Sequence, residues 1–106
     1  MKSGYLYIIT NPAHEGWVKV GVTSDIKSRL RTYQTSDPSR RYKVEYYIHH
    51  PDVYAAEKQV KELMEPFALQ IKNEWYEIPI HMAIPRLDET LENVDNSFLK
   101  EEIKIS

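Results

Sequence analysis

Two charged residues stand on helix faces that should otherwise be apolar, and the first is an arginine. In the predicted helix 23–35, Ile26, Leu30 and Tyr33 recur at the spacing of a packed helical face, and Arg29 falls within the same stripe. A guanidinium stays charged at any ordinary pH, so on such a face it needs an anionic partner. Its planar fork of donors suits a carboxylate or a phosphate. The spacing therefore predicts an ion pair or an anion-binding site.

Glu57 is the second charged residue on such a helix face, and its charge is negative. It follows Val53 by four residues and precedes Val60 by three in the predicted helix 52–67, so it lies at the edge of the apolar stripe. A carboxylate in that position requires a partner, a metal ion or a changed pKa. A plain salt bridge between Arg29 and Glu57 across the core is the simplest structural interpretation of the pair.

The elements that would position these residues begin with a predicted hairpin. Residues 4–10 and 17–22 are aromatic and β-branched runs, separated by the turn-forming sequence NPAHEG. Period-two alternation places Tyr5, Tyr7 and Lys19 on one face of this hairpin, whereas the valines of the second strand point to the other. We therefore expect the two tyrosines and the lysine to lie together.

The rest of the chain predicts a small α+β domain. A loop at 36–41 precedes a strand at 42–50, and a short strand at 74–78 follows the helix 52–67. Pro79 and Pro85 are expected to interrupt the chain before a short helix at 86–94, and residues 98–106 fit either a helix or a strand. The order β-β-α-β-α-β with a helical tail predicts an α/β (α+β) fold, in which helices flank a mostly antiparallel sheet of three to four strands.

Composition narrows the class of protein. The 106 residues suit one domain, and the absence of cysteine excludes disulfides and thiolate metal sites. No apolar run is long enough for a signal peptide or a membrane span, so we expect a soluble, cytoplasmic protein. The net charge is -2, yet residues 19–43 hold seven basic and two acidic side chains. A basic patch on an acidic body is compatible with phosphate contact or with a simple solvated surface.

Taken in order, these features resemble the GIY-YIG nuclease superfamily. The chain has YLY near its start, KVG after a short turn, an arginine eight residues after that glycine, and a glutamate within an apolar helix. The resemblance covers roughly residues 4–78 and is greatest to the compact branch found in phage and bacterial DNA-binding proteins. It implies a nuclease domain over residues 1–80, with residues 81–106 as a helical or extended extension packed on it.

The family's functional residues transfer position by position. The tyrosine of the first motif corresponds to Tyr7, and the helix arginine corresponds to Arg29. The metal-binding glutamate corresponds to Glu57. Lys19 stands where the second motif has its tyrosine, which is a departure from the family pattern. Asn73 is the nearest counterpart of a late asparagine found in many members.

The resemblance implies a DNA endonuclease that depends on Mg²⁺ or Mn²⁺. Glu57 would hold the metal ion, and Arg29 would bind the scissile phosphate. Tyr7 would orient or deprotonate the attacking water, with the charge of Lys19 lowering the pKa of the phenol. A catalytically inactive DNA-binding module of the same fold is the alternative. A protein-interaction or inhibitor domain, with the acidic C-terminal third docked on a basic partner, is a third interpretation.

Several further residues have both a functional and a plain structural interpretation. Tyr5 and Tyr33 either line the pocket or pack, and Trp17 and Trp75 are interpreted as core or edge packing rather than base-stacking platforms. The candidates for contacts with the DNA backbone are Arg31, Arg40 and Arg41. Because 106 residues leave no room for a separate recognition domain, we expect specificity to be weak or to come from a homodimer or a partner protein.

Overall fold

The computed structural model describes residues 2–105, with side chains placed as far as Glu92. Within these residues the elements are β1 (Gly4–Thr10), β2 (Trp17–Thr23), α1 (Ile26–Ser36), β3 (Lys43–His50), α2 (Val53–Met64), β4 (Ile71–Lys72), β5 (Trp75–Glu77) and α3 (Ile80–Ile105). Short 3-10 turns occupy Pro12–His14 and Glu65–Phe67. The predicted α+β class is confirmed. The sheet has one strand more than predicted, because the two-residue β4 is too short to show any periodicity.

The five strands form one antiparallel sheet in the order β3-β1-β2-β5-β4. Tyr7 is paired with Gly21 on one side and with Tyr47 on the other, and Ile9 is paired with Lys19. This register confirms that Tyr7 and Lys19 share a face of the sheet. Strand β5 pairs with β2 only along Trp17–Lys19. Among the described residues, the second half of β2 therefore has β1 as its only strand neighbour.

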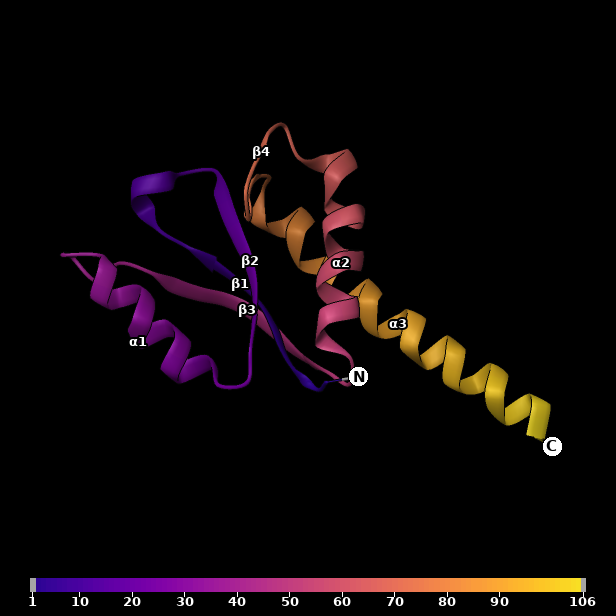
Figure 1. Ribbon diagram of the computed structural model, residues 1–106. Coiled ribbons are helices and arrows are strands. Elements are labelled where there is room, and N and C mark those ends of the chain that lie inside the picture. Colours follow the sequence, from indigo (N-terminus) through magenta and orange to yellow (C-terminus); the bar gives the residue numbers. More distant parts are fainter. Residues whose placement is uncertain (1, 106) are drawn as a thin grey trace.

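Helices cover both faces of this sheet. Helices α2 and α3 pack on one face and α1 lies against the other (Figure 1). The predicted stripe of α2 is largely confirmed, since its buried residues are Val53, Ala56, Val60 and Met64. Phe67, the last residue of the predicted helix 52–67, was expected to continue this stripe after Met64, but it is 40% exposed. Helix α2 ends at Met64, and the 3-10 turn that follows directs Phe67 toward the guanidinium of Arg86, 4.5 Å from its ring centroid.

Helix α3 corrects a prediction based on proline. It begins at Ile80 and continues through Pro85, whereas the sequence predicted a short helix starting at residue 86. A proline removes one helical hydrogen bond, here to the carbonyl of His81. Both residues are exposed, so water can reach that carbonyl. Buried Ala83 and Leu87 hold this part of α3 in the core. The backbone of 98–105 is helical, which resolves the ambiguity for that segment, and residue 106 lies outside the described residues.

A buried histidine joins three elements behind the sheet. The Nδ1 atom of His50 accepts a hydrogen bond from the backbone N–H of Asp52, 3.0 Å away. Its Nε2 atom lies 3.3 Å from the carbonyl oxygen of Thr90 in α3. Because Nδ1 is an acceptor, Nε2 carries the proton and donates to Thr90. His50 therefore fixes the end of β3 to the start of α2 and to α3.

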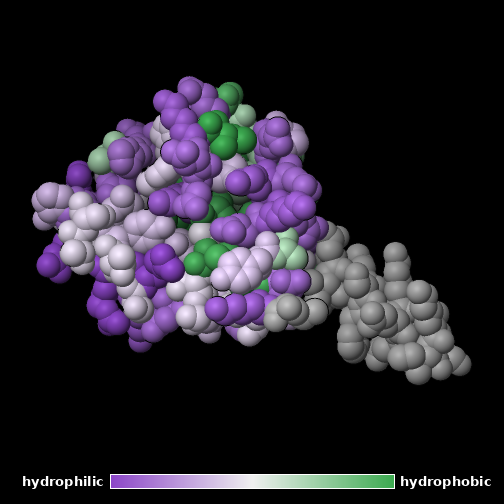
Figure 2. Space-filling model, in the orientation of Figure 1, coloured by the Kyte–Doolittle hydropathy of each residue, from purple (hydrophilic) through white to green (hydrophobic). Residues whose placement is uncertain are grey.

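The surface is mainly polar. On the face of the molecule shown in Figure 2, hydrophilic residues predominate and hydrophobic ones form only small patches. In the part of the chain that the structure describes, no helix combines the length and the apolar character needed to cross a bilayer.

A carboxylate fixes the far end of α1 to the end of β1. Asp37, the C-cap residue of α1, is 7% exposed, and its Oδ2 atom accepts from the Asn11 amide at 2.9 Å and from the Arg41 N–H at 2.8 Å. Its Oδ1 atom accepts from the N–H of Ser39 at 3.0 Å. The Arg41 N–H, followed by the other donors, lowers the pKa of Asp37 from 3.8 to about 2. The ionised carboxylate thus organises the loop that follows α1.

We expect Asp37→Asn to lower the melting temperature at neutral pH, because an amide has one acceptor oxygen where the carboxylate serves three donors. The pKa of Asp37 is depressed on folding, so its contribution is complete above 3.8 and is lost as the pH falls toward about 2. The melting temperatures of wild type and variant should therefore approach each other as the pH falls from 3.8 to about 2. The exposed Glu62→Gln is the control. An unchanged melting temperature at neutral pH would contradict the role of Asp37.

Candidate active site

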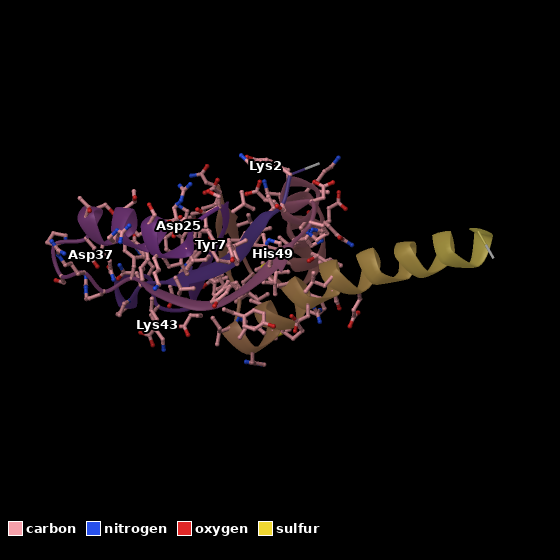
Figure 3. The ribbon with its side chains drawn as sticks, turned by 90° about the horizontal axis from the view of Figure 1, so that it is seen from below. Lys2, Tyr7, Asp25, Asp37, Lys43 and His49 are labelled. Atoms are coloured by element: carbon pink, nitrogen blue, oxygen red, sulfur yellow. The ribbon has the colours of Figure 1, made fainter. Side chains whose placement is uncertain are left out.

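The phenol of Tyr7 occupies the centre of the sheet face that α1 covers (Figure 3). Tyr7 is 2% exposed, and its hydroxyl lies 3.0 Å from the hydroxyl of Tyr33 on α1. The two rings meet edge to face with centroids 6.3 Å apart. The phenol also lies over Gly21, where a Cβ atom would overlap it. The glycine of KVG is therefore required by the space that the Tyr7 ring occupies.

Tyr7 is held in its neutral form. Burial is the largest cause that raises the pKa of the phenol well above its usual value, followed by the hydrogen bond and charge of Tyr33. The guanidinium of Arg29 lowers this pKa in part, and the carboxylate of Glu74 raises it further. Lys19 was predicted to lower the pKa of Tyr7, but the pKa is raised, and the positive charge that acts on the phenol is that of Arg29.

Lys19 interacts instead with the other groups around the site. Its Nζ atom lies 3.7 Å from the Oε2 atom of Glu74, in an ion pair in which the lysine side chain is 22% exposed. The same ammonium lies 5.1 Å from the ring centroid of Tyr33 and 5.8 Å from that of Trp75. Aromatic faces attract cations, so these rings help to hold the ammonium in place.

Glu57 lies on α2 and is coupled to this group through the charge of Glu74. Its side chain is half-buried, and burial is the largest cause that raises its pKa above 4.5. Repulsion from the carboxylate of Glu74 raises it further, and Lys61 lowers it in part. Burial, followed by the charge of Glu57, also raises the pKa of Tyr76 to about 12. Glu57 and Arg29, both described by the structure, form no salt bridge with each other. The simplest structural interpretation of the pair is therefore wrong.

Arg29 is exposed, contrary to the prediction that it points into packed structure. The reason is that α1 contains no buried residue and rests on the sheet through half-buried side chains such as Tyr33. Arg29 lines a cavity of about 160 Å³ together with Gly4 of β1 and Val53 of α2. Since its charge also acts on Tyr7, the guanidinium lies at the same end of the site as the phenol.

Glu74 is the residue that sequence reasoning missed. It lies in the turn between β4 and β5, and its carbonyl oxygen accepts a hydrogen bond of 3.2 Å from the N–H of Val20. Its carboxylate pairs with Lys19 and acts on both Tyr7 and Glu57. The carboxylate of Glu74 therefore acts electrostatically on residues of β1, β2 and α2. The only sequence signal was its position directly after the candidate Asn73.

The backbone conformation at position 73 favours asparagine. Its φ angle is +56°, in the left-handed region that asparagine tolerates better than most residues. Its side chain is exposed. This geometry forms the two-residue turn that delivers Glu74 to the site.

The acidic side chains available for a metal ion are few. Among the described residues, no group of three or more histidine, cysteine, aspartate or glutamate side chains is arranged to hold one. Glu57 and Glu74 are close enough to repel each other, and a divalent cation would relieve that repulsion. A site with one or two carboxylates, completed by water and phosphate oxygens, is the kind that Mg²⁺ favours.

The remaining predicted residues divide into two groups. Tyr33 joins the site through Tyr7, whereas Tyr5 packs against Tyr47 and His49, with ring centroids 5.8 and 5.2 Å away. The three arginines predicted to contact DNA are exposed: Arg31, Arg40 and Arg41. Arg40 and Arg41 lie in the loop beyond Asp37, at the opposite end of α1 from Asp25 (Figure 3). The Arg41 Nε atom is 3.5 Å from the Asp37 carboxylate.

Comparisons with known proteins place these features in a family. No curated protein and no solved structure matches the chain significantly. The T5orf172 domain matches residues 4–95, a span that begins with β1 and ends within α3. It includes all the residues of the candidate site. The chain therefore belongs to the T5orf172 domain family, a GIY-YIG-like domain associated with nucleases.

Proposed function

We propose that this protein is a divalent-metal-dependent DNA endonuclease. The observation that supports it best is electrostatic: one carboxylate, Glu74, pairs with Lys19 and acts on both Tyr7 and Glu57. Arg29 also acts on Tyr7. Side chains of three types that phosphodiester hydrolysis uses, a phenol, a guanidinium and a carboxylate, are thus electrostatically coupled through Tyr7 and Glu74. Membership in a nuclease-associated family supports the same activity.

Glu57 is proposed to hold Mg²⁺ or Mn²⁺, with Glu74 as the nearest second carboxylate. The observation behind this assignment is the mutual repulsion of the two acidic side chains. When bound, the metal would stabilise charge on the phosphate and lower the pKa of a bound water. Half-burial of Glu57 limits competition from bulk water and fixes the direction of its oxygens.

Arg29 is proposed to bind the scissile phosphate. Its exposure, unexpected for a packed helix face, is what a substrate contact requires. The guanidinium can donate two parallel hydrogen bonds to phosphate oxygens, which holds the phosphorus in one orientation. The adjoining cavity of about 160 Å³ leaves room for those oxygens.

Tyr7 is proposed to orient the attacking water as a neutral phenol. Since burial and Tyr33 raise its pKa, the hydroxyl keeps its proton at neutral pH and acts through hydrogen bonds rather than as a base. Lys19, placed near the Tyr33 ring and Glu74, would balance the charge of the acidic pair. Arg31, Arg40 and Arg41 are proposed to contact the DNA backbone away from the reaction.

A DNA-binding module without turnover is the second candidate. The observation that favours it is that Tyr7, with its raised pKa, keeps its proton at neutral pH and so cannot take one from water. Nicking of supercoiled plasmid with Mg²⁺, with Mn²⁺ and with chelator separates the two functions. Cleavage that requires the metal supports the endonuclease. DNA binding without cleavage in either metal supports the second candidate.

The Glu57→Gln variant separates catalysis from folding. Because the pKa of Glu57 is raised above 4.5 on folding, its ionised form opposes folding at neutral pH, and this effect disappears as the pH falls below 4.5. We expect the variant to melt at a higher temperature than wild type at neutral pH and to lose metal-dependent nicking. The Mg²⁺-induced rise in melting temperature should also be lost. Glu62→Gln, exposed on the same helix, is the control. An unchanged Mg²⁺ effect in Glu57→Gln would exclude Glu57 as the metal ligand.

The Arg29→Lys variant tests the phosphate contact. Lysine keeps the charge but lacks the fork of donors, so we expect turnover to fall about hundredfold or more, with DNA affinity changed only slightly. Arg31→Lys, an equally conservative change at another exposed arginine of α1, should retain turnover. Single-turnover cleavage and anisotropy titrations measure the two quantities. Equal turnover in the two variants would contradict the assignment.

The double variant Arg40→Ala/Arg41→Ala tests the predicted backbone contacts. Each phosphate contact that is lost should reduce the slope of log affinity against log salt concentration by about one. A salt titration with wild type and variant, carried out in chelator to prevent cleavage, measures that slope. Identical slopes would place both arginines off the path of the DNA.

A further inference from the structure

A second pocket lies beside the candidate active site, on the same face of the sheet. It has a volume of about 290 Å³ and is lined by His14, Trp17, Lys72 and Trp75. The register of β2, β5 and β4 places Trp17, Lys72 and Trp75 on the face that carries Lys19. Both tryptophans are half-buried, so part of each ring is open to the pocket.

The pocket walls combine aromatic rings with positive charge. The rings of His14 and Trp75 meet edge to face with centroids 5.2 Å apart. The Nζ atom of Lys72 lies 5.8 Å from the ring centroid of Trp17, and Lys19 lies 5.8 Å from that of Trp75. Two ammonium groups beside the indoles disfavour a cationic ligand, although aromatic cages otherwise suit one. A ligand with a planar ring and a phosphate suits both the indoles and the ammonium groups. The ring can stack on an indole, and the phosphate can pair with an ammonium group.

Acidic side chains near the pocket already have partners. Glu74 pairs with Lys19, and the Oε1 atom of Glu77 accepts from the amide of Gln70 at 3.2 Å. Lys72 is exposed at the mouth of the pocket. The residues that line the pocket include a lysine and no acidic side chain, so the charged group at its wall is positive.

Lys19 links this pocket to the candidate active site. Its ammonium lies 5.1 Å from the ring centroid of Tyr33, which bonds to Tyr7, and 5.8 Å from that of Trp75 in the pocket wall. Lys19 thus contacts residues of both sites. A single strand that runs along this face over more than one nucleotide can place a phosphate at Arg29 and a base in the pocket.

We propose that this pocket binds one unpaired nucleobase of the DNA strand being cleaved. The inference rests on the proposed function and specifies its substrate, since a base in an intact duplex is stacked inside the helix and cannot enter a side pocket. The volume lies just below the range of roughly 300–1,000 Å³ of ligand pockets, which suits one base rather than several. Single-stranded DNA, or duplex with a displaced base, is therefore the preferred substrate.

The test uses the two tryptophans as reporters. The chain has only two, and both line the pocket, so their fluorescence reports on stacking there. In chelator, the wild-type chain is titrated with a short single-stranded oligothymidylate and with the same backbone made abasic, which keeps the phosphates and removes the bases. We expect quenching by the first, and roughly five- to hundredfold weaker binding of the second. Equal affinities, or binding of the oligothymidylate without any change in fluorescence, would overturn the proposal.

Variants assign the effect to the pocket. Trp75→Leu keeps an apolar side chain and should weaken binding of the oligothymidylate to the level of the abasic strand, with binding of the abasic strand unchanged. Tyr47→Leu, an exposed aromatic on the same face but outside the pocket, should bind both strands as wild type does. Circular dichroism checks that each variant is folded. If Trp75→Leu does not fold, the comparison of the two strands on wild type still decides the question.

Plasmid nicking distinguishes this proposal from the proposed function. Metal-dependent nicking without any preference for bases over abasic strand overturns the pocket and leaves the endonuclease intact. A preference for bases without nicking supports the pocket and identifies the protein as a binding module for unpaired DNA.

Discussion

The hydroxyl of Tyr7 needs a hydrogen-bond partner because it is buried, and meeting that need organises the site. Tyr33 provides the partner at 3.0 Å, which brings α1 against the sheet. The ring requires empty space above its neighbour in β2, so position 21 is glycine. The ring of Tyr33 in turn gives Lys19 an aromatic face to rest near. One buried phenol thus links the first strand, the second strand and the first helix.

Opposite charges balance around that phenol without joining in a single ion pair. Arg29 remains exposed, Lys19 pairs with Glu74, and Glu57 keeps a raised pKa because it is half-buried and because its acidic neighbour repels it. An ion pair between Arg29 and Glu57 would balance both charges but would occupy both groups. Keeping them apart leaves both groups available to a ligand with phosphate and metal, which is the physical basis of the proposed function.

The sequence predicted those features that depend directly on periodicity. Alternation along β1 and β2 correctly placed Tyr7 beside Lys19, and the helical stripe of α2 correctly placed Glu57 at the edge of the core. Periodicity shows which residues lie on the same side of a helix. It does not show how closely that side packs on the sheet, so the exposure of Arg29 was missed. Glu74 was missed because it depends on a turn between very short strands. The raised pKa of Tyr7 depends on burial, which no count of neighbouring charges reveals.

Helix α1 carries Arg29 yet has no buried residue, and the Asp37 carboxylate secures only its far end. Its amide protons should therefore exchange with solvent by local opening at a smaller free-energy cost than those of β1 or α2. Since little of the core depends on α1, this helix can accept new surface residues without loss of the sheet. The helix proposed to hold the phosphate is thus also the part of the domain whose surface evolution can change most readily.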